Sequence, residues 1–150
     1  MKVKITRVDK DLPLPKYETA GAVAFDVLVR VTTVIDSQSI GRVPVNVIVE
    51  IPKGYMLLLK DRSSTAKKKG LICTPGFVDQ DFCGDGDEIC LQFFNFLKEP
   101  VTLERGERLG QAAFVRVDIA EWEEVESMAK PTRGGFGSTD KKVTKKKKRS

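Results

Sequence analysis

A chain of 150 residues has the length of one domain, and 41% hydrophobic with 31% charged residues is an ordinary globular composition. The sequence contains no histidine, which excludes Ser-His-Asp and Cys-His catalysis and the usual zinc hydrolase sites. The net charge of +5 comes from the last ten residues, because residues 1–140 contain 19 basic and 21 acidic side chains.

Short β-rich segments follow one another along most of the chain. After an alternating start at residues 3–5, the segments 22–31, 55–60, 89–97 and 111–119 favour strands. Turn signals containing proline or glycine separate them, as in Pro52-Lys53-Gly54 and Arg105-Gly106-Glu107. No long segment has the 3.6-residue period of a helix, and residues 121–129 fit either a helical turn or a last strand. This pattern predicts an all-β sandwich, jelly roll or barrel.

Residues 43–51 have the clearest alternation in the chain. Valine or isoleucine occupies every second position, namely Val43, Val45, Val47, Val49 and Ile51. Side chains two residues apart share one face of a strand. We therefore predict one strand here, with these five side chains on its buried face.

The C-terminal part differs in composition from the rest. Residues 130–140 (KPTRGGFGSTD) are rich in glycine and predict a flexible arm, and residues 141–150 contain six lysines and one arginine without an acid. Such a block repels itself and is expected to be disordered, with only nonspecific contact to polyanions such as nucleic acid. We therefore predict a β-domain at 1–130, an arm at 131–140 and a basic tail at 141–150.

The cysteines and the hydropathy of the sequence indicate the cellular compartment of the protein. Cys73, Cys83 and Cys90 are odd in number and form no C-x-x-C pair, which argues against a disulfide framework and a structural zinc site. No run of about 18 apolar residues is present, and the first residues lack the apolar segment of a signal peptide. We expect a cytoplasmic protein with reduced thiols and no membrane partner.

Five stretches do not look like core-forming strands. They are 20–26 (AGAVAFD), 62–66 (RSSTA), 76–82 (GFVDQDF), 106–111 (GERLGQ) and 133–139 (RGGFGST). Taken singly, each stretch is a weak signal of function, because glycines and small polar residues at turns also have purely structural uses. In their order and spacing, however, they resemble the five ordered motifs of the trimeric dUTPase family over roughly residues 14–140.

The resemblance implies a fold, an activity and an assembly. The fold is a distorted jelly roll or β-barrel of the dUTPase type with a flexible C-terminal arm. The activity is Mg²⁺-dependent hydrolysis of dUTP to dUMP and pyrophosphate, which limits uracil in DNA and supplies dUMP for thymidylate synthesis. Mg²⁺ is held mainly by the substrate phosphates rather than by protein ligands. The assembly is a homotrimer whose shared active sites each combine segments of three subunits.

Three residues match the family's catalytic positions. Asp79, in the third motif, corresponds to the carboxylate that orients and deprotonates a water aimed at the α-phosphorus. Asp26, in the first motif, supports the network near the metal-bound water. Gln111, in the fourth motif, hydrogen-bonds the α-phosphate or the water.

Phosphate and base recognition fall to the second and third motifs. Arg62 offers a planar guanidinium to phosphate oxygens, and the Ser63 and Ser64 hydroxyls and amides meet the leaving pyrophosphate. The substrate-binding residues of the third motif are Gly76, Asp81 and Phe82. Backbone groups around Gly76 match the uracil edge, while the Phe82 ring packs under the deoxyribose.

The fifth motif implies the closing arm. Phe136 corresponds to the ring that stacks on uracil, Gly137 lets the backbone approach the phosphates, and Ser138 adds a donor. Arg133 corresponds to the γ-phosphate ligand, although two residues fewer separate it from Phe136 than in the family pattern. A further departure is the short insertion at residues 85–87.

Other functions remain open at this stage. A dCTP deaminase, or a bifunctional dCTP deaminase–dUTPase, has the same fold and an Arg-Ser-Ser signature, but works with a catalytic glutamate in the hairpin region. The 79–82 segment (DQDF) and the 135–139 segment (GFGST) favour a dUTPase. A small nucleic-acid-binding barrel is disfavoured by the acidic balance of residues 1–140. A catalytically inactive family member is the remaining alternative.

Overall fold

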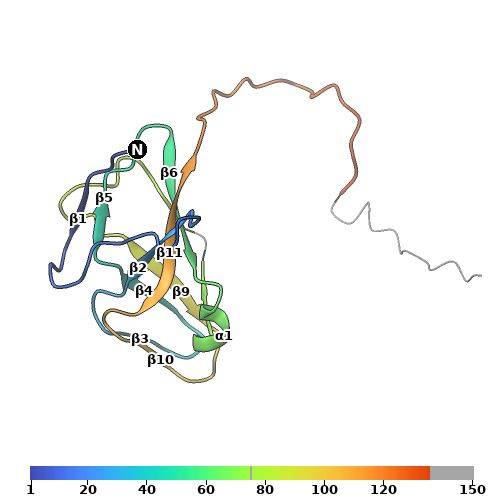
Figure 1. Ribbon diagram of the computed structural model, residues 1–150. Helices are drawn as coiled ribbons and strands as arrows, with labels where there is room; N and C mark the ends of the chain where they lie inside the picture. The colour runs from blue at the N-terminus through green and yellow to red at the C-terminus, as the bar shows by residue number, and fades with distance from the viewer. Residues whose placement is uncertain (75, 136–150) are drawn as a thin grey trace, which may run out of the picture. The chain divides into compact units, whose positions relative to one another are not determined.

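A computed structural model describes residues 1–74 and 76–135 of the chain (Figure 1). It divides the chain into two units, Met1–Ile119 and Ala120–Ser150. The described residues contain eleven strands and one helix of five residues, which confirms the all-β prediction. Residues 120–130, which the sequence analysis placed with the β-domain, belong to the second unit.

All the regular elements lie in the first unit. In chain order they are β1 (Ile5–Arg7), β2 (Phe25–Leu28), β3 (Thr33–Ile35), β4 (Ile40–Pro44), β5 (Val47–Val49), β6 (Tyr55–Asp61), α1 (Thr65–Lys69), β7 (Leu71–Cys73), β8 (Gly76–Val78), β9 (Cys90–Asn95), β10 (Val101–Leu103) and β11 (Arg108–Arg116).

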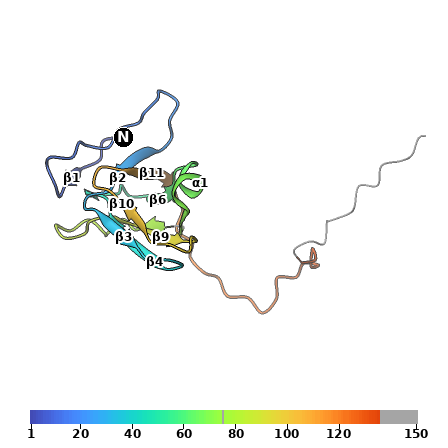
Figure 2. The same cartoon turned by 90° about the horizontal axis from the view of Figure 1, so that it is seen from below.

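The strands form four antiparallel sheets. The largest has the order β2-β11-β6-β8, a second has the order β4-β9-β7, and β1-β5 and β10-β3 are pairs. Figure 2, seen from below, shows β2 and β11 on one side of the unit, with β3, β4 and β9 on the other. The core fills the space between these layers, and Phe93, Leu57 and Leu71 are completely enclosed there. Burying one such side chain stabilises the fold by about 1.5–3 kcal/mol.

The prediction for residues 43–51 is right about burial and wrong about a single strand. All five alternating side chains are buried, at 3% exposure or less. The strand is interrupted because Asn46 adopts a left-handed backbone conformation with φ of 68°, which asparagine tolerates better than most residues. The Asn46 side chain accepts a hydrogen bond from Asp9 N at 2.6 Å and donates one to Asp9 O at 3.0 Å. The interruption therefore ties the N-terminal segment to the sheet.

Residues 121–129 form neither of the expected elements. The structure gives them no helix and no strand, and Trp122 is 93% exposed. Within the described residues, no helix has the length and apolar character needed to cross a membrane.

Candidate active site

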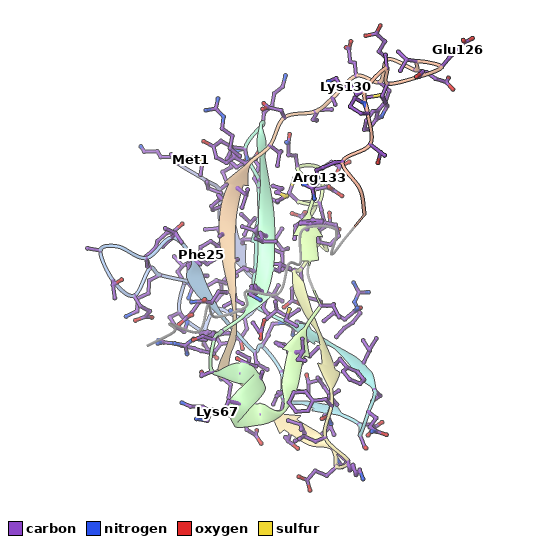
Figure 3. All side chains as sticks on the ribbon, turned by 90° about the vertical axis from the view of Figure 1, so that its right-hand side faces the viewer. Met1, Phe25, Lys67, Glu126, Lys130 and Arg133 are labelled. Atoms are coloured by element: carbon purple, nitrogen blue, oxygen red, sulfur yellow. The ribbon has the colours of Figure 1, made fainter. Side chains whose placement is uncertain are left out.

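A buried carboxylate lies where the first, second and fourth motif stretches meet. Asp26 on β2 and Gln111 on β11 are register partners, and Gln111 Nε2 donates a hydrogen bond of 3.1 Å to Asp26 Oδ1. Arg62, directly after β6, brings its Nε within 3.3 Å of the same oxygen. Asp26 is 5% exposed, and its Oδ2 has no hydrogen-bond partner among the described residues. Phe25, labelled in Figure 3, precedes it on β2.

One carbonyl group holds the Arg-Ser-Ser turn against β11. The β2–β11 register shifts between Arg108 and Gly110, and such irregularities redirect backbone groups near functional sites. The Leu109 carbonyl accepts hydrogen bonds from Arg62 N at 3.1 Å and from Thr65 Oγ1 at 2.8 Å. Thr65 is 3% exposed. The sequence analysis gave this residue no role, because its partner lies 44 positions away.

The two serines of this turn keep their hydroxyl groups available. Ser63 is exposed, and Ser64 precedes α1 without making a side-chain capping hydrogen bond. Arg62 keeps 37% of its side chain exposed although Asp26 holds its Nε. The guanidinium is therefore oriented from one side and open to an anion from the other.

The third motif stretch forms β8 and the turn after it, here named the hairpin arm, although β8 pairs with β6 and not with the following strand β9. A cavity of about 320 Å³ lies beside this segment. Strand β8 pairs with β6, and the turn after it closes through a hydrogen bond from Phe82 N to Asp79 O at 3.3 Å. Gly76, Asp79 and Phe82 all line the cavity, whereas Asp81 is exposed and does not. A Cβ at Gly76 would make an ordinary van der Waals contact with Leu59 at 3.4 Å.

A polar row forms part of the same cavity wall. Arg42 and Gln92 are register partners on β4 and β9, and Gln92 Nε2 donates a hydrogen bond of 3.1 Å to Thr74 Oγ1. The sequence analysis missed these three residues, because single polar residues within or directly after strands carry no motif.

The insertion at residues 85–87 forms a closed turn. Asp87 accepts a hydrogen bond from Gly84 N at 2.7 Å and donates one from its own N to Gly84 O at 2.9 Å. After the turn, Glu88 forms a 2.7 Å ion pair with Arg30. The hydrogen bond to Glu88 raises the pKa of Arg30 further above its ordinary value. The extra residues therefore form a turn of their own and do not interrupt β9, the strand that follows.

Asp79 and Gln111 do not meet within one chain. Val78 pairs with Leu57, and Leu57 pairs with Phe114, so Asp79 lies two strands and four residues from Gln111. With about 3.4 Å per residue and about 4.8 Å between strands, their backbones are roughly 17 Å apart. A general base and the groups binding the attacked phosphate must lie within hydrogen-bond reach of one water. One chain therefore holds the two halves of the predicted site separately.

The fifth motif stretch is described only in part. Arg133, labelled in Figure 3, is exposed, and Gly134 has a positive φ of 95°. The predicted site residues Phe136, Gly137 and Ser138 lie outside the described residues, as does the basic tail at 141–150.

Comparison with known proteins gives consistent matches. Residues 10–140 match a family model described as dUTPase. Two similar proteins are named deoxyuridine 5'-triphosphate nucleotidohydrolase. The protein from Dictyoglomus turgidum is 36% identical over 147 residues, which cover 93% of this chain and 98% of that protein. The protein from Brucella melitensis is 39% identical over 140 residues, 87% of this chain and 86% of that protein.

Solved structures confirm the predicted fold. The dUTPase of Staphylococcus bacteriophage 80alpha with dUPNHPP has a TM-score of 0.82 at 21% identity, covering 92% of this chain and 98% of that one. A mutant dUTPase from phage phi11 of S. aureus, described with a structural Mg(II) ion, has a TM-score of 0.77 at 19% identity. The match covers 85% of this chain and 99% of that one. The fold agrees with these structures, and the family-model match and the relatives above 30% identity show that the chain belongs to the dUTPase family.

Proposed function

We propose that this chain hydrolyses dUTP to dUMP and pyrophosphate, with Asp79 as the base that activates the attacking water. One observation carries the proposal: an exposed carboxylate, Asp79, lies at the wall of a cavity of about 320 Å³ that is lined by residues of β8, the turn after it and the neighbouring strands. In a chain without histidine, a carboxylate is the natural proton acceptor. The product dUMP supplies thymidylate synthesis, and removal of dUTP limits uracil in DNA.

The cavity selects the base through its backbone. Gly76 leaves its peptide groups open to hydrogen bonds with the uracil edge, and cytosine would leave such groups unpaired at a cost of about 1–3 kcal/mol each. The half-exposed Phe82 ring packs against the deoxyribose and leaves no room for a 2′-hydroxyl. Asp81 binds substrate from outside the cavity wall, at the same turn. The polar row of Arg42, Gln92 and Thr74 lines the same cavity.

The phosphates lie at the other half of the site. Arg62 donates to the phosphate oxygens while Asp26 holds its Nε, and Ser63 and Ser64 donate to the leaving pyrophosphate. Gln111 orients the α-phosphate or the water, and its own orientation is fixed by the hydrogen bond to Asp26. Preorganised donors of this kind stabilise the charge that develops on the leaving group.

The active protein is a homotrimer with shared sites. The separation of roughly 17 Å between Asp79 and Gln111 supports this proposal, because a second copy must bring the phosphate-binding half to the hairpin of the first. The arm at 131–140 closes over the nucleotide, with Arg133 and Ser138 at the phosphates, Phe136 on the uracil and Gly137 allowing close backbone approach.

Mg²⁺, bound mainly through the phosphates of dUTP, would neutralise their charge. The carboxylates of the site fit an ion bound in this way, since they would accept hydrogen bonds from its water ligands. Asp26 Oδ2, which is buried and lacks a partner among the described residues, would be one such acceptor.

We also propose a cytoplasmic location. The free thiols of Cys73, Cys83 and Cys90 support it, because reducing compartments keep cysteines unpaired. The basic tail at 141–150 makes only nonspecific, salt-sensitive contact with polyanions.

The activity is tested with purified full chain, Mg²⁺ and separate assays for pyrophosphate and ammonia. We expect pyrophosphate from dUTP and no ammonia from dCTP, and Asp79→Asn should lower kcat by at least about a hundredfold with the fold retained. Asp85→Asn, an exposed change in the neighbouring turn, is the matched control. Ammonia from dCTP would instead support the deaminase or the bifunctional alternative.

Shared sites are tested by mixing two inactive variants. Asp79→Asn lacks the hairpin half of the site, and Arg62→Gln lacks the phosphate half. Trimers that contain both variants combine one intact hairpin with one intact phosphate half, so mixing after reversible unfolding should restore activity. No recovery in correctly sized trimers, checked by light scattering, would place the whole site within one chain.

A further inference from the structure

A second cavity, of about 380 Å³, lies beside α1 and contains a lysine that the proposed mechanism does not use. Its lining combines the end of the Arg-Ser-Ser turn, the helix and the loop that leads into β11. The lining residues are Arg62, Ser64, Thr65, Lys68, Lys69 and residues 106–109. Arg62 and Ser64 connect this cavity to the proposed phosphate half of the site.

Most of the positive charge around the cavity is neutralised. Arg62 pairs with Asp26 at 3.3 Å, Lys69 with Glu107 at 2.7 Å, and Arg108 with Glu18 at 3.1 Å. Lys68 is exposed and has no carboxylate within 4.0 Å among the described residues. Of the four cations that line the cavity, Lys68 is thus the one whose charge the described part of the chain leaves unpaired.

The helix directs Lys68 and Ser64 to the same side. Lys68 N donates a hydrogen bond of 2.9 Å to Ser64 O, and residues four apart lie on one face of a helical turn. Lys67, labelled in Figure 3, precedes it on α1 and does not line the cavity. The buried Thr65 hydroxyl fixes the start of this helix to Leu109. Lys68 therefore lines the same cavity as Ser64, the serine proposed to meet the leaving pyrophosphate.

We infer that Lys68 is a direct ligand of the distal phosphates of the substrate, and that this cavity binds inorganic polyphosphate by itself. The inference rests on the proposed function for the identity of the substrate. An ammonium group acts as a strong point charge on phosphate oxygens. Pyrophosphate released from the site would remain at Lys68 until it dissociates, which makes it a product inhibitor.

The test compares Lys68→Gln with Lys67→Gln in the full-length protein. Both variants remove one positive charge from the same helix and keep the lysine block at 141–150, so nonspecific attraction changes equally. Lys68→Gln should weaken tripolyphosphate binding in calorimetry about tenfold, raise the KM for dUTP similarly and leave inhibition by dUMP unchanged. Lys67→Gln should change each quantity less than about twofold. Lys68→Arg should retain most of the affinity.

The outcomes separate this inference from the proposed function. If the wild-type protein releases no pyrophosphate from dUTP, the proposed function fails, whereas tripolyphosphate binding still tests the cavity directly. If dUTP is hydrolysed but Lys68→Gln binds tripolyphosphate normally, or loses no more than Lys67→Gln, Lys68 is not a ligand. Equal weakening of dUMP and tripolyphosphate would also overturn the inference, because dUMP carries no distal phosphate.

Discussion

Replacing Gly110 with alanine should disturb both the core and the active site. Gly110 lies on β11 directly before Gln111, and its backbone packs against Leu91, which is 1% exposed. An added Cβ would lie 3.1 Å from Leu91 Cδ2 and 3.2 Å from Cγ, and closer still to Cδ1. Because Leu91 is enclosed in the core, it cannot move aside without displacing its neighbours.

The expected cost follows from this overlap. One extra methyl group in a packed core destabilises by about 1–3 kcal/mol, and the several close contacts with one enclosed side chain favour about 2 kcal/mol. The strain should also shift Gln111 away from Asp26, whose hydrogen bond is 3.1 Å long, and so lower kcat.

A double-mutant cycle gives the decisive measurement. Leu91→Ala alone should cost about 2–5 kcal/mol through the cavity that it creates. In that background the methyl group of Gly110→Ala has room, so the second substitution should cost less by about 1–2 kcal/mol. Urea unfolding at one fixed protein concentration measures all four proteins, since the stability of an oligomer depends on concentration. The same cost for Gly110→Ala in both backgrounds would refute the packing argument.

Three further predictions concern single side chains. Thr65→Val should cost about 1–2 kcal/mol in urea unfolding and raise the KM for dUTP, because the Leu109 carbonyl loses one of its two donors, while Thr65→Ser should retain both properties. The hydrogen bond from Arg105 lowers the pKa of Asp9 below 3.8. The ionised Asp9 carboxylate therefore stabilises the fold above pH 3.8, and this stabilisation is lost as the pH falls through the lowered pKa. Asp9→Asn should accordingly make the free energy of unfolding less dependent on pH in the acid range, as unfolding measured at several pH values can show. Burial raises the pKa of Cys73 to about 11, so iodoacetamide at pH 8 should modify it last of the three thiols, as peptide mass spectrometry can show.

The sequence was most informative where its signal was local. Period-two alternation located the buried face at residues 43–51, since burial repeats with the pleat of a strand. It did not reveal that Asn46 interrupts the strand, because a left-handed asparagine looks like any polar residue in an alternating run. The hydrogen bonds that favour this conformation come from Asp9, 37 positions away.

The sequence singles out candidate site residues but does not show how they are arranged. Asp26 and Gln111 were singled out from separate motif stretches. Only the β2–β11 register shows that the Gln111 side-chain amide holds the Asp26 carboxylate. Within the 62–66 stretch Thr65 was given no role of its own, and Lys68 was not singled out. Thr65 acts through the Leu109 carbonyl, and Lys68 lines a cavity between α1 and the loop that leads into β11. Neither feature leaves a periodic trace in the sequence.

The two halves of the site, near β8 and near β11, differ in the sequence changes that they can accept. Under the proposed function, the cavity beside Gly76 takes the base, whereas the phosphate half consists of charged side chains anchored by Asp26 and Leu109. The insertion at residues 85–87 lies outside both halves, in a turn closed by hydrogen bonds between Gly84 and Asp87. The phosphate half is also open to added cations, since a helix that begins directly at the Arg-Ser-Ser turn directs Lys68 to the same cavity as Ser64. Under the inference above, Lys68 on α1 would supply a cation to the distal phosphates in addition to Arg133 of the shortened fifth motif.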